Sequence, residues 1–178
     1  MQDSEIRIRA EHPADFEAID SVHRRAFKLA HGESVAELVR KIRSSNRYVP
    51  DFALVASRNG SVIGHILVSY TDLVANGNMR QILMLSPLGV DPEFQRAGVG
   101  SALTKEVLKL ADERSEPIVV LEGNPAYYLR FGFRPARSLA IEFPAHVPEE
   151  AAQACPLSAY DSTLSGRVIY PSAFDDLH

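Results

Sequence analysis

The chain has 178 residues, of which 46% are hydrophobic, with a formal net charge of −4 and a single cysteine, Cys155. This length suits one domain over residues 1–178 that buries roughly 70% of its unfolded surface, and a lone cysteine excludes an intrachain disulfide and fits the cytoplasm. The acidic balance disfavours nucleic acid as a partner, and we expect no membrane span because no apolar run approaches the ~20 residues that one needs.

The first third of the chain alternates between strand and helix periodicities. Residues 5–10 alternate apolar and charged side chains, which predicts a half-buried strand. Apolar side chains at helical spacing follow over 14–27 and again over 33–45, and each set predicts a helix with one buried face. The runs 52–57 and 61–70 flank the Asn-Gly pair of "RNG", so we expect these strands to form a β-hairpin.

The middle of the chain has the pattern of a βαβ unit. Residues 79–90 predict a strand, 99–113 a helix, and 118–123 a second strand rich in Val, Ile and Leu. A crossover helix between two such strands makes them parallel. In the tail, "LAIEF" and "GRVIY" predict two further strands, so the whole chain is expected to be an α/β fold.

The loop "DPEFQRAGVG" in front of the predicted helix contains Gly98 and Gly100. A helix start offers unpaired N–H groups and the positive end of the helix dipole, and glycine lets phosphate oxygens approach the backbone. The loop is therefore a candidate anion site, and a simple tight turn into the helix is the alternative. A P-loop is excluded because the required Lys is missing. A nicotinamide dinucleotide fingerprint fits poorly, because Leu103 replaces its last small residue and Gly98 lies too far behind the strand.

The order of these motifs resembles the GNAT superfamily of N-acetyltransferases, in particular its bacterial YhbS-like branch. A strand ends in "LGV", the loop fits the family pattern Q/R-x-x-G-x-G/A, and "YYLRFGF" follows the next strand. The resemblance implies a GNAT-like mixed central sheet, splayed between two parallel strands and flanked by helices. It also implies acetyl-CoA as co-substrate, no metal, and acetyl transfer to a primary amine of a small molecule or peptide by direct attack in a ternary complex. A homodimer is compatible with it. The alternative is a non-catalytic acyl-CoA-binding sensor or interaction module.

The resemblance further implies roles for individual residues. The backbone of Leu88, Gly89 and Val90 would bind the pantetheine arm, and an N–H near Val90 would stabilise the oxyanion. Asn124 would also contact the pantetheine. Tyr128 would protonate the departing thiolate, and packing within its own helix is the alternative role. Gln95 would brace the loop, and Ala97 belongs to the same cofactor-binding loop. The residues whose amides would hold the pyrophosphate are Arg96, Gly98, Val99, Gly100 and Ser101.

No general base is evident from the sequence. The strand before the loop reads "ILMLSPLGV", without the Glu that many relatives carry there, and this keeps the sensor alternative open. The candidates for the base are Ser86 through a water molecule, Glu122, Glu33, Glu37 and His65. We expect His23, in the apolar stripe of the first helix, to be a core histidine. Cys155 has no identifiable partner for a role as an acyl-carrying nucleophile.

Overall fold

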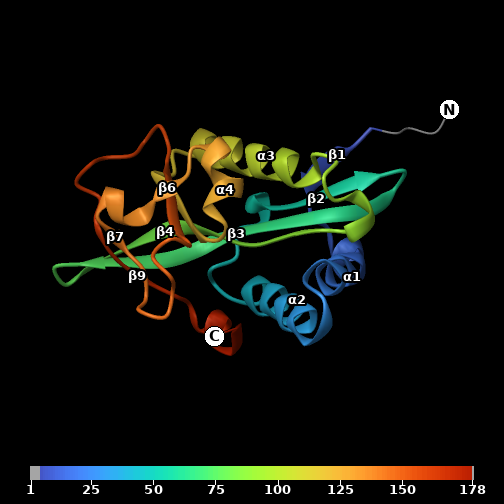
Figure 1. The fold of residues 1–178 in the computed structure, drawn as a ribbon, viewed down its shortest axis with the longest axis horizontal. Coiled ribbons are helices and arrows are strands. Elements are labelled where there is room, and N and C mark those ends of the chain that lie inside the picture. The colour runs from blue at the N-terminus through green and yellow to red at the C-terminus, as the bar shows by residue number, and fades with distance from the viewer. Residues whose placement is uncertain (1–4, 178) are drawn as a thin grey trace.

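The structure is a computed structural model that describes residues 5–177, without the side chains of Leu29 and Ala30. Within these residues a single sheet of nine strands carries helices on both faces (Figure 1). The strands are β1 (Arg7–Ala10), β2 (Ala53–Arg58), β3 (Ser61–Ala75), β4 (Asn78–Val90), β5 (Ile118–Glu122), β6 (Arg134–Pro135), β7 (Ile141–Glu142), β8 (Ala152–Pro156) and β9 (Gly166–Ile169). The α-helices are α1 (Phe16–Phe27), α2 (Leu29–Arg43), α3 (Val99–Glu113) and α4 (Pro125–Tyr128). None of the helices in the described part of the chain is long and apolar enough to cross a membrane.

Two consecutive hairpins join β2, β3 and β4. The predicted hairpin turns at Asn59 and Gly60, which have φ angles of 51° and 79°. A second Asn-Gly pair, Asn76 and Gly77, has φ angles of 51° and 77° and turns β3 into β4. Positive φ at both central residues is what a two-residue type I′ turn requires. The sequence prediction ended the earlier strand at residue 70 and missed this second turn, so β3 is longer than expected, whereas β4 agrees with the predicted strand 79–90 to within one residue.

The parallel pair of the predicted βαβ unit is confirmed, and it is short. Strands β4 and β5 pair only at Leu83 with Val119 and at Met84 with Val120. Beyond Met84 the two strands part, which gives the splayed mixed sheet that the resemblance implies. On its other side β5 pairs with β8, an antiparallel strand that the sequence did not predict. The sheet order is β1-β2-β3-β4-β5-β8-β6, and β9 and β7 extend it beside β3.

Each face of the sheet is covered by the apolar side of different helices. On one face Ile19 from α1 and Leu38 from α2 pack in one cluster with Met84 of β4. On the other face Val99 and Leu103 of α3 pack in a second cluster. The predicted helices are confirmed with shifted ends: α1 begins after a short 3₁₀-helix, η1 (Pro13–Asp15), and α2 begins before residue 33.

The C-terminal segment returns to the middle of the molecule. Strand β9 pairs with the outer half of β3, where Asp72 lies opposite Ile169. The chain then continues through Tyr170 into a final 3₁₀-helix, η6 (Ser172–Leu177), which lies against α2 (Figure 1). The predicted strand "LAIEF" is reduced to the two residues of β7, because Ala140 before it has a positive φ of 55° and Pro144 follows it closely.

Candidate active site

The gap between β4 and β5 exposes one edge of β4. The N–H of Asp91 donates to the carbonyl of Ile63 on β3, at 2.9 Å. Peptide groups of an antiparallel pair alternate in direction, so those of Gly89 also face β3, and those of Leu88 and Val90 face the gap. The Val90 carbonyl accepts a hydrogen bond from Gln95 Nε2 at 3.0 Å. An extended ligand with amide groups can therefore add to this edge as a strand would.

A first cleft of about 410 Å³ runs from this edge to the start of α3. Gly98, at φ 83°, is the residue before the helix, and a Cβ there would meet no atom within 4 Å. At Gly100 a Cβ would lie 2.6 Å from the hydroxyl oxygen of Tyr127, so the Tyr127 side chain occupies the space that a side chain at position 100 would take. The cleft is lined by Ala26, Phe27, Leu88, Gly89, Val90, Phe94, Gln95, Arg96, Gly98, Val99, Gly100, Ser101, Tyr127 and Arg130.

The charged side chains that line this first cleft are both cationic. Arg96 comes from the predicted loop, and Arg130 comes from the segment after α4. The Arg130 guanidinium lies 4.4 Å from the ring centroid of Tyr127, and its Nε donates to the Tyr127 carbonyl at 3.1 Å. Two cations beside a helix start suit a multiply charged anion. The sequence prediction missed Arg130, although it stands inside the quoted motif "YYLRFGF".

Most of the residues predicted to bind the cofactor meet in the first cleft, with two exceptions. Ala97 belongs to the same loop and is exposed, but it does not line the cleft. Asn124 lies elsewhere, where its Oδ1 accepts the N–H of Ala126 at 3.0 Å and caps α4. Because its side-chain oxygen has this structural role, Asn124 offers mainly its amide nitrogen to a ligand.

A second cleft of about 430 Å³ opens on the other side of Leu88. Its lining comes from α2, β4, the end of β5, α4 and the C-terminal segment. It shares Phe27 and Leu88 with the first cleft, so the two clefts meet there. The lining residues are Phe27, His31, Val35, Leu38, Met84, Leu85, Ser86, Pro87, Leu88, Glu122, Gly123, Asn124, Tyr128, Tyr170, Phe174 and Leu177.

Tyr128 lines this second cleft, whereas its neighbour Tyr127 lines the first. The Tyr128 ring packs edge-on against Phe133 and fills the space beside Gly123, where a Cβ would lie 2.7 Å from its Cε2. Burial, and to a smaller extent Tyr127, raises the pKa of Tyr128. At neutral pH its hydroxyl therefore stays protonated and can donate a proton or a hydrogen bond.

Among the carboxylates proposed as general base, the structure brings only Glu122 to the second cleft within the described residues. Its Oε2 accepts a hydrogen bond from the Tyr170 hydroxyl at 3.1 Å. Glu33 instead pairs with Arg24 and Arg40, whose hydrogen bonds lower the pKa of Glu33 to about 2 and make it a weak base. Ser86 also lines the cleft, whereas Glu37 pairs with Lys41 at 3.2 Å on another part of the surface.

His65, the last candidate base, lies in a buried chain of three groups behind β4. Glu11 Oε2 lies 2.8 Å from His65 Nε2, and His65 Nδ1 lies 2.8 Å from His23 Nε2. Burial opposes ionisation of Glu11, but hydrogen bonds from His65 and Arg43 lower its pKa to about 2. A carboxylate accepts only, so His65 Nε2–H donates to Glu11 and His23 Nε2–H donates to His65.

The last nitrogen of this hydrogen-bonded chain is His23 Nδ1, which carries no proton and can accept a hydrogen bond. This atom is buried and has no hydrogen-bond partner among the described residues. Burial, and next His65, lowers the pKa of His23 well below its usual value, so the ring is neutral. A Cβ on Gly89 would lie 2.6 Å from His23 Nδ1. Gly89 thus leaves room for the His23 ring, in addition to its place in the first cleft.

Cys155 lies in β8, outside both clefts. Its Sγ is 3.7 Å from the Phe131 carbonyl, and burial raises the pKa of the thiol to about 11. A buried thiol that stays protonated is a poor nucleophile. The structure therefore offers no support for an acyl-enzyme step through Cys155.

Comparison with known proteins gives relatives over most of the chain. Residues 7–136 match the family model described as an acetyltransferase (GNAT) domain. The uncharacterized N-acetyltransferase YjhQ of Escherichia coli K12 is 33% identical over 162 residues, which are 87% of this chain and 86% of YjhQ. The crystal structure of Escherichia coli YhbS in complex with CoA has a TM-score of 0.85 and 31% identity, covering 96% of this chain and 92% of YhbS. A GNAT family acetyltransferase from Brucella melitensis, in complex with acetyl-CoA, has a TM-score of 0.78 and 28% identity, covering 97% and 99% of the two chains.

Proposed function

Because the chain belongs to the GNAT family of acetyltransferases, we propose that it acetylates a primary amine by direct attack on acetyl-CoA within a ternary complex. The protein is an acetyl-CoA-dependent N-acetyltransferase. The observation that carries the proposed mechanism is the junction of two different clefts at Leu88. The first cleft is lined by two arginines and by the start of α3. The second cleft is lined by the Glu122 carboxylate and by Tyr128, whose hydroxyl is protonated.

In the proposed complex the first cleft holds acetyl-CoA. The pyrophosphate lies against the loop 95–101, where the N–H groups at the start of α3 and the charges of Arg96 and Arg130 face it. The pantetheine arm extends along the edge of β4 and uses the peptide groups of Leu88 and Val90. Gln95 supports this edge through its bond to the Val90 carbonyl. Gly89 contributes space rather than a peptide group, and Asn124 borders the acceptor side.

The amine enters through the second cleft and meets the thioester at Leu88. Glu122, directly or through water, accepts the proton that the ammonium must lose before it attacks. The nitrogen forms a bond to the thioester carbon, and a gap-facing N–H of β4 stabilises the oxyanion. The C–S bond then breaks, and Tyr128 donates its proton to the leaving thiolate. The second proton of the attacking nitrogen is lost as the amide forms and returns through water to the Tyr128 phenolate, and Glu122 releases its own proton to solvent. Each role is consistent with the place of its residue in the lining of the cleft.

The non-catalytic alternative is less consistent with this arrangement. A CoA sensor needs only the first cleft, and its acetyl end can be closed by apolar side chains. Instead the second cleft joins the first at Leu88 and contains Glu122. We further propose, from the sequence, that residues 1–178 form one domain, that the protein is cytoplasmic and that it can form a homodimer.

Turnover of amines tests the proposal directly. The purified protein is incubated with acetyl-CoA and a library of primary amines, and released CoA is followed with a thiol reagent. Acetyl transfer above the rate of acetyl-CoA hydrolysis, with acetylated product found by mass spectrometry, supports the proposed function. Tight binding of acetyl-CoA with no acetylated product from any amine would instead favour the sensor.

A further inference from the structure

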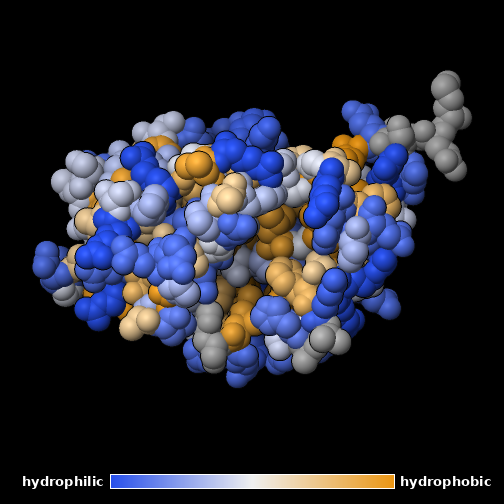
Figure 2. Space-filling view, viewed as in Figure 1, coloured by the Kyte–Doolittle hydropathy of each residue, from blue (hydrophilic) through white to orange (hydrophobic). Residues whose placement is uncertain are grey.

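The second cleft has a polar and an apolar set of lining residues. The polar groups include those of Ser86, Asn124, Tyr128 and Glu122. The apolar set contains side chains that are themselves buried. They are Val35 and Leu38 of α2, Met84 of β4 and Phe174 of η6. Figure 2 shows apolar surface gathered in the hollow at the middle of this face, with hydrophilic side chains around it.

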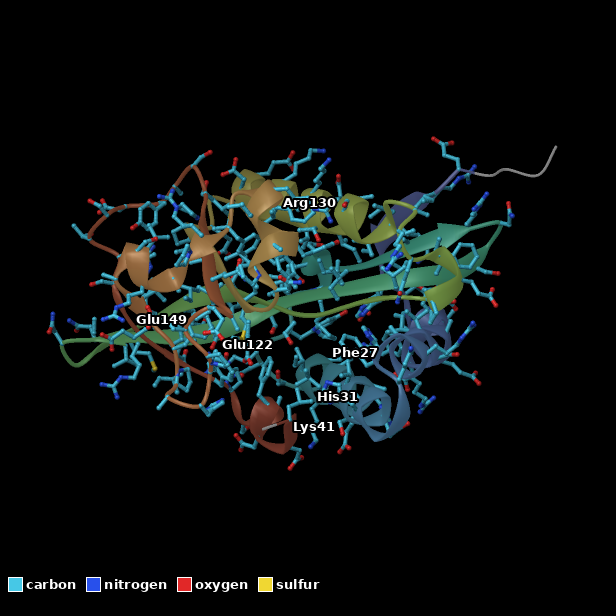
Figure 3. The ribbon with its side chains drawn as sticks, viewed as in Figure 1. Phe27, His31, Lys41, Glu122, Arg130 and Glu149 are labelled. Carbon is cyan, nitrogen blue, oxygen red and sulfur yellow. The ribbon has the colours of Figure 1, made fainter. Side chains whose placement is uncertain are left out.

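Glu122 is the single Asp, Glu, Lys or Arg among the described side chains that line this cleft. It stands at the end of β5, across the hollow from Phe27 and His31 (Figure 3). One ammonium group beside Glu122 is therefore matched in charge. A second charge on the same molecule finds no further Asp, Glu, Lys or Arg partner among the described lining side chains. A charge left unpaired against the apolar wall weakens binding.

The wall also contains aromatic rings that can hold a flat or branched apolar group. Phe27 lies where the two clefts meet, and Tyr170 and Phe174 pack together with ring centroids 5.5 Å apart. Aromatic pairs of this kind gain energy beyond the area they bury. The Tyr170 hydroxyl also donates a hydrogen bond to Glu122. One side chain therefore contacts the carboxylate and forms part of the aromatic wall.

From these observations we infer that the acceptor is a small monoamine on an uncharged apolar body, such as an arylalkylamine or a branched alkylamine. This inference rests on the proposed function, because it assigns the second cleft to the amine. The ammonium lies at Glu122, and the body extends toward Val35, Leu38 and Phe174. The cleft volume of about 430 Å³ is within the usual range for small-molecule sites.

A panel of four amines that differ in charge and bulk tests the inference on the unmodified protein. The values of kcat/KM are compared for 2-phenylethylamine, phenylalanine, 1,4-diaminobutane and a tetrapeptide with a free N-terminus. We expect 2-phenylethylamine to exceed each of the others by about 100-fold or more, because each of them adds a charge or bulk that the apolar wall does not match. The amino acid is the sharpest comparison, since it differs only by a carboxylate.

Two substitutions locate the effect in the cleft. Glu122→Gln should lower kcat/KM for 2-phenylethylamine by about 10- to 1000-fold and leave the Kd for acetyl-CoA within about 2-fold. The matched control is Glu37→Gln, which removes a carboxylate from α2 outside the cleft and should leave the order of the four amines unchanged. His31→Glu adds a carboxylate at an exposed position of the lining and should shift preference toward 1,4-diaminobutane, whereas His31→Gln should not.

The outcomes separate this inference from the proposed function. If the diamine, the amino acid or the peptide is the best acceptor, the inferred class is wrong while acetyl transfer stands. If none of the four amines is acetylated but another amine of the library is, the inferred class is wrong and acetyl transfer stands. If acetyl-CoA binds and no amine of the library is acetylated, the proposed function fails and the inference fails with it. If 2-phenylethylamine is best but Glu122→Gln has no effect, the amine does not use the site that we assign. Circular dichroism of each variant confirms that it is folded.

Discussion

Replacing Gly89 by alanine tests the packing behind β4. The added Cβ would lie 2.6 Å from His23 Nδ1 and 2.9 Å from His23 Cε1, closer than real Cβ contacts occur. The ring has little room to move, since His23 is 0% exposed and its other nitrogen is bonded to His65. Gly89 does not have a positive φ, so an alanine causes no backbone strain. The clash with the imidazole is the local cost.

The expected size of the effect follows from two contributions. Overpacking of a well-filled core costs about 1–3 kcal/mol. If the ring moves far enough to break the His23–His65 hydrogen bond, another 0.5–1.5 kcal/mol, roughly, is lost. The sum is about 1.5–4.5 kcal/mol. At about 2–4 °C per kcal/mol for a chain of this size, Tm should fall by roughly 3–18 °C.

Thermal unfolding without CoA, followed by circular dichroism, measures this change. The double variant Gly89→Ala with His23→Ala removes the clashing ring, so it should be no less stable than His23→Ala alone. A double-mutant cycle should then give a coupling free energy of about 1 kcal/mol or more. If Gly89 is present only to admit CoA, the alanine variant will keep its Tm and lose affinity alone. A Tm within about 1 °C of the unmodified protein would refute the packing argument.

Three further predictions concern the site and the buried histidines. Tyr128→Phe should keep acetyl-CoA affinity and lower kcat by about 10- to 1000-fold if thiolate protonation limits turnover, and an unchanged single-turnover rate would assign Tyr128 to packing. Gly98→Val should weaken acetyl-CoA binding by about 10-fold or more in calorimetry. Gly60→Val is its control, because Gly60 has φ 79° against 83° for Gly98 and neither has an atom near a Cβ, so equal affinities would contradict the cradle. Burial lowers the pKa values of His23 and His65 in the folded state, so the unfolded state binds more protons below pH ~6.5. The free energy of unfolding in urea should therefore be smaller at pH 5.5 than at pH 7.5, and equal values would contradict this protonation scheme.

Local sequence patterns predicted much of the part of the fold that surrounds the first cleft. The Asn-Gly turn at 59–60, the helix after Gly98 and the two strands around it each follow from signals within a few residues. The turn at 76–77 carries the same signal, but the polar Thr71 and Asp72 interrupted the apolar run before it. Both are buried, because Thr71 Oγ1 donates to the Ile169 carbonyl and Asp72 pairs with Arg47. These partners are distant in the chain and leave no local trace.

The residues of the second cleft were harder to predict, because their partners are also distant in the chain. Glu122 was one of several possible bases, and only the three-dimensional path of the chain brings it beside Tyr170, 48 residues later. The chain of Glu11, His65 and His23 likewise joins groups 54 and 42 residues apart. The apolar stripe of α1 predicted a core histidine at His23, but not its partners.

The two clefts draw part of their lining from different regions of the sequence, because the described part of the C-terminal segment lines the second cleft and not the first. The lining of the first cleft is complete by Arg130, whereas Tyr170, Phe174 and Leu177 complete the second cleft. Residues 7–136, which match the family model, stop before that segment begins. If the second cleft binds the amine, as we propose, a change in the last dozen residues alters which amine is accepted without touching the lining of the first cleft. Exchanging residues 166–177 between related chains would transplant acceptor preference, and the same segment is a poor place for an affinity tag in any assay of substrate choice.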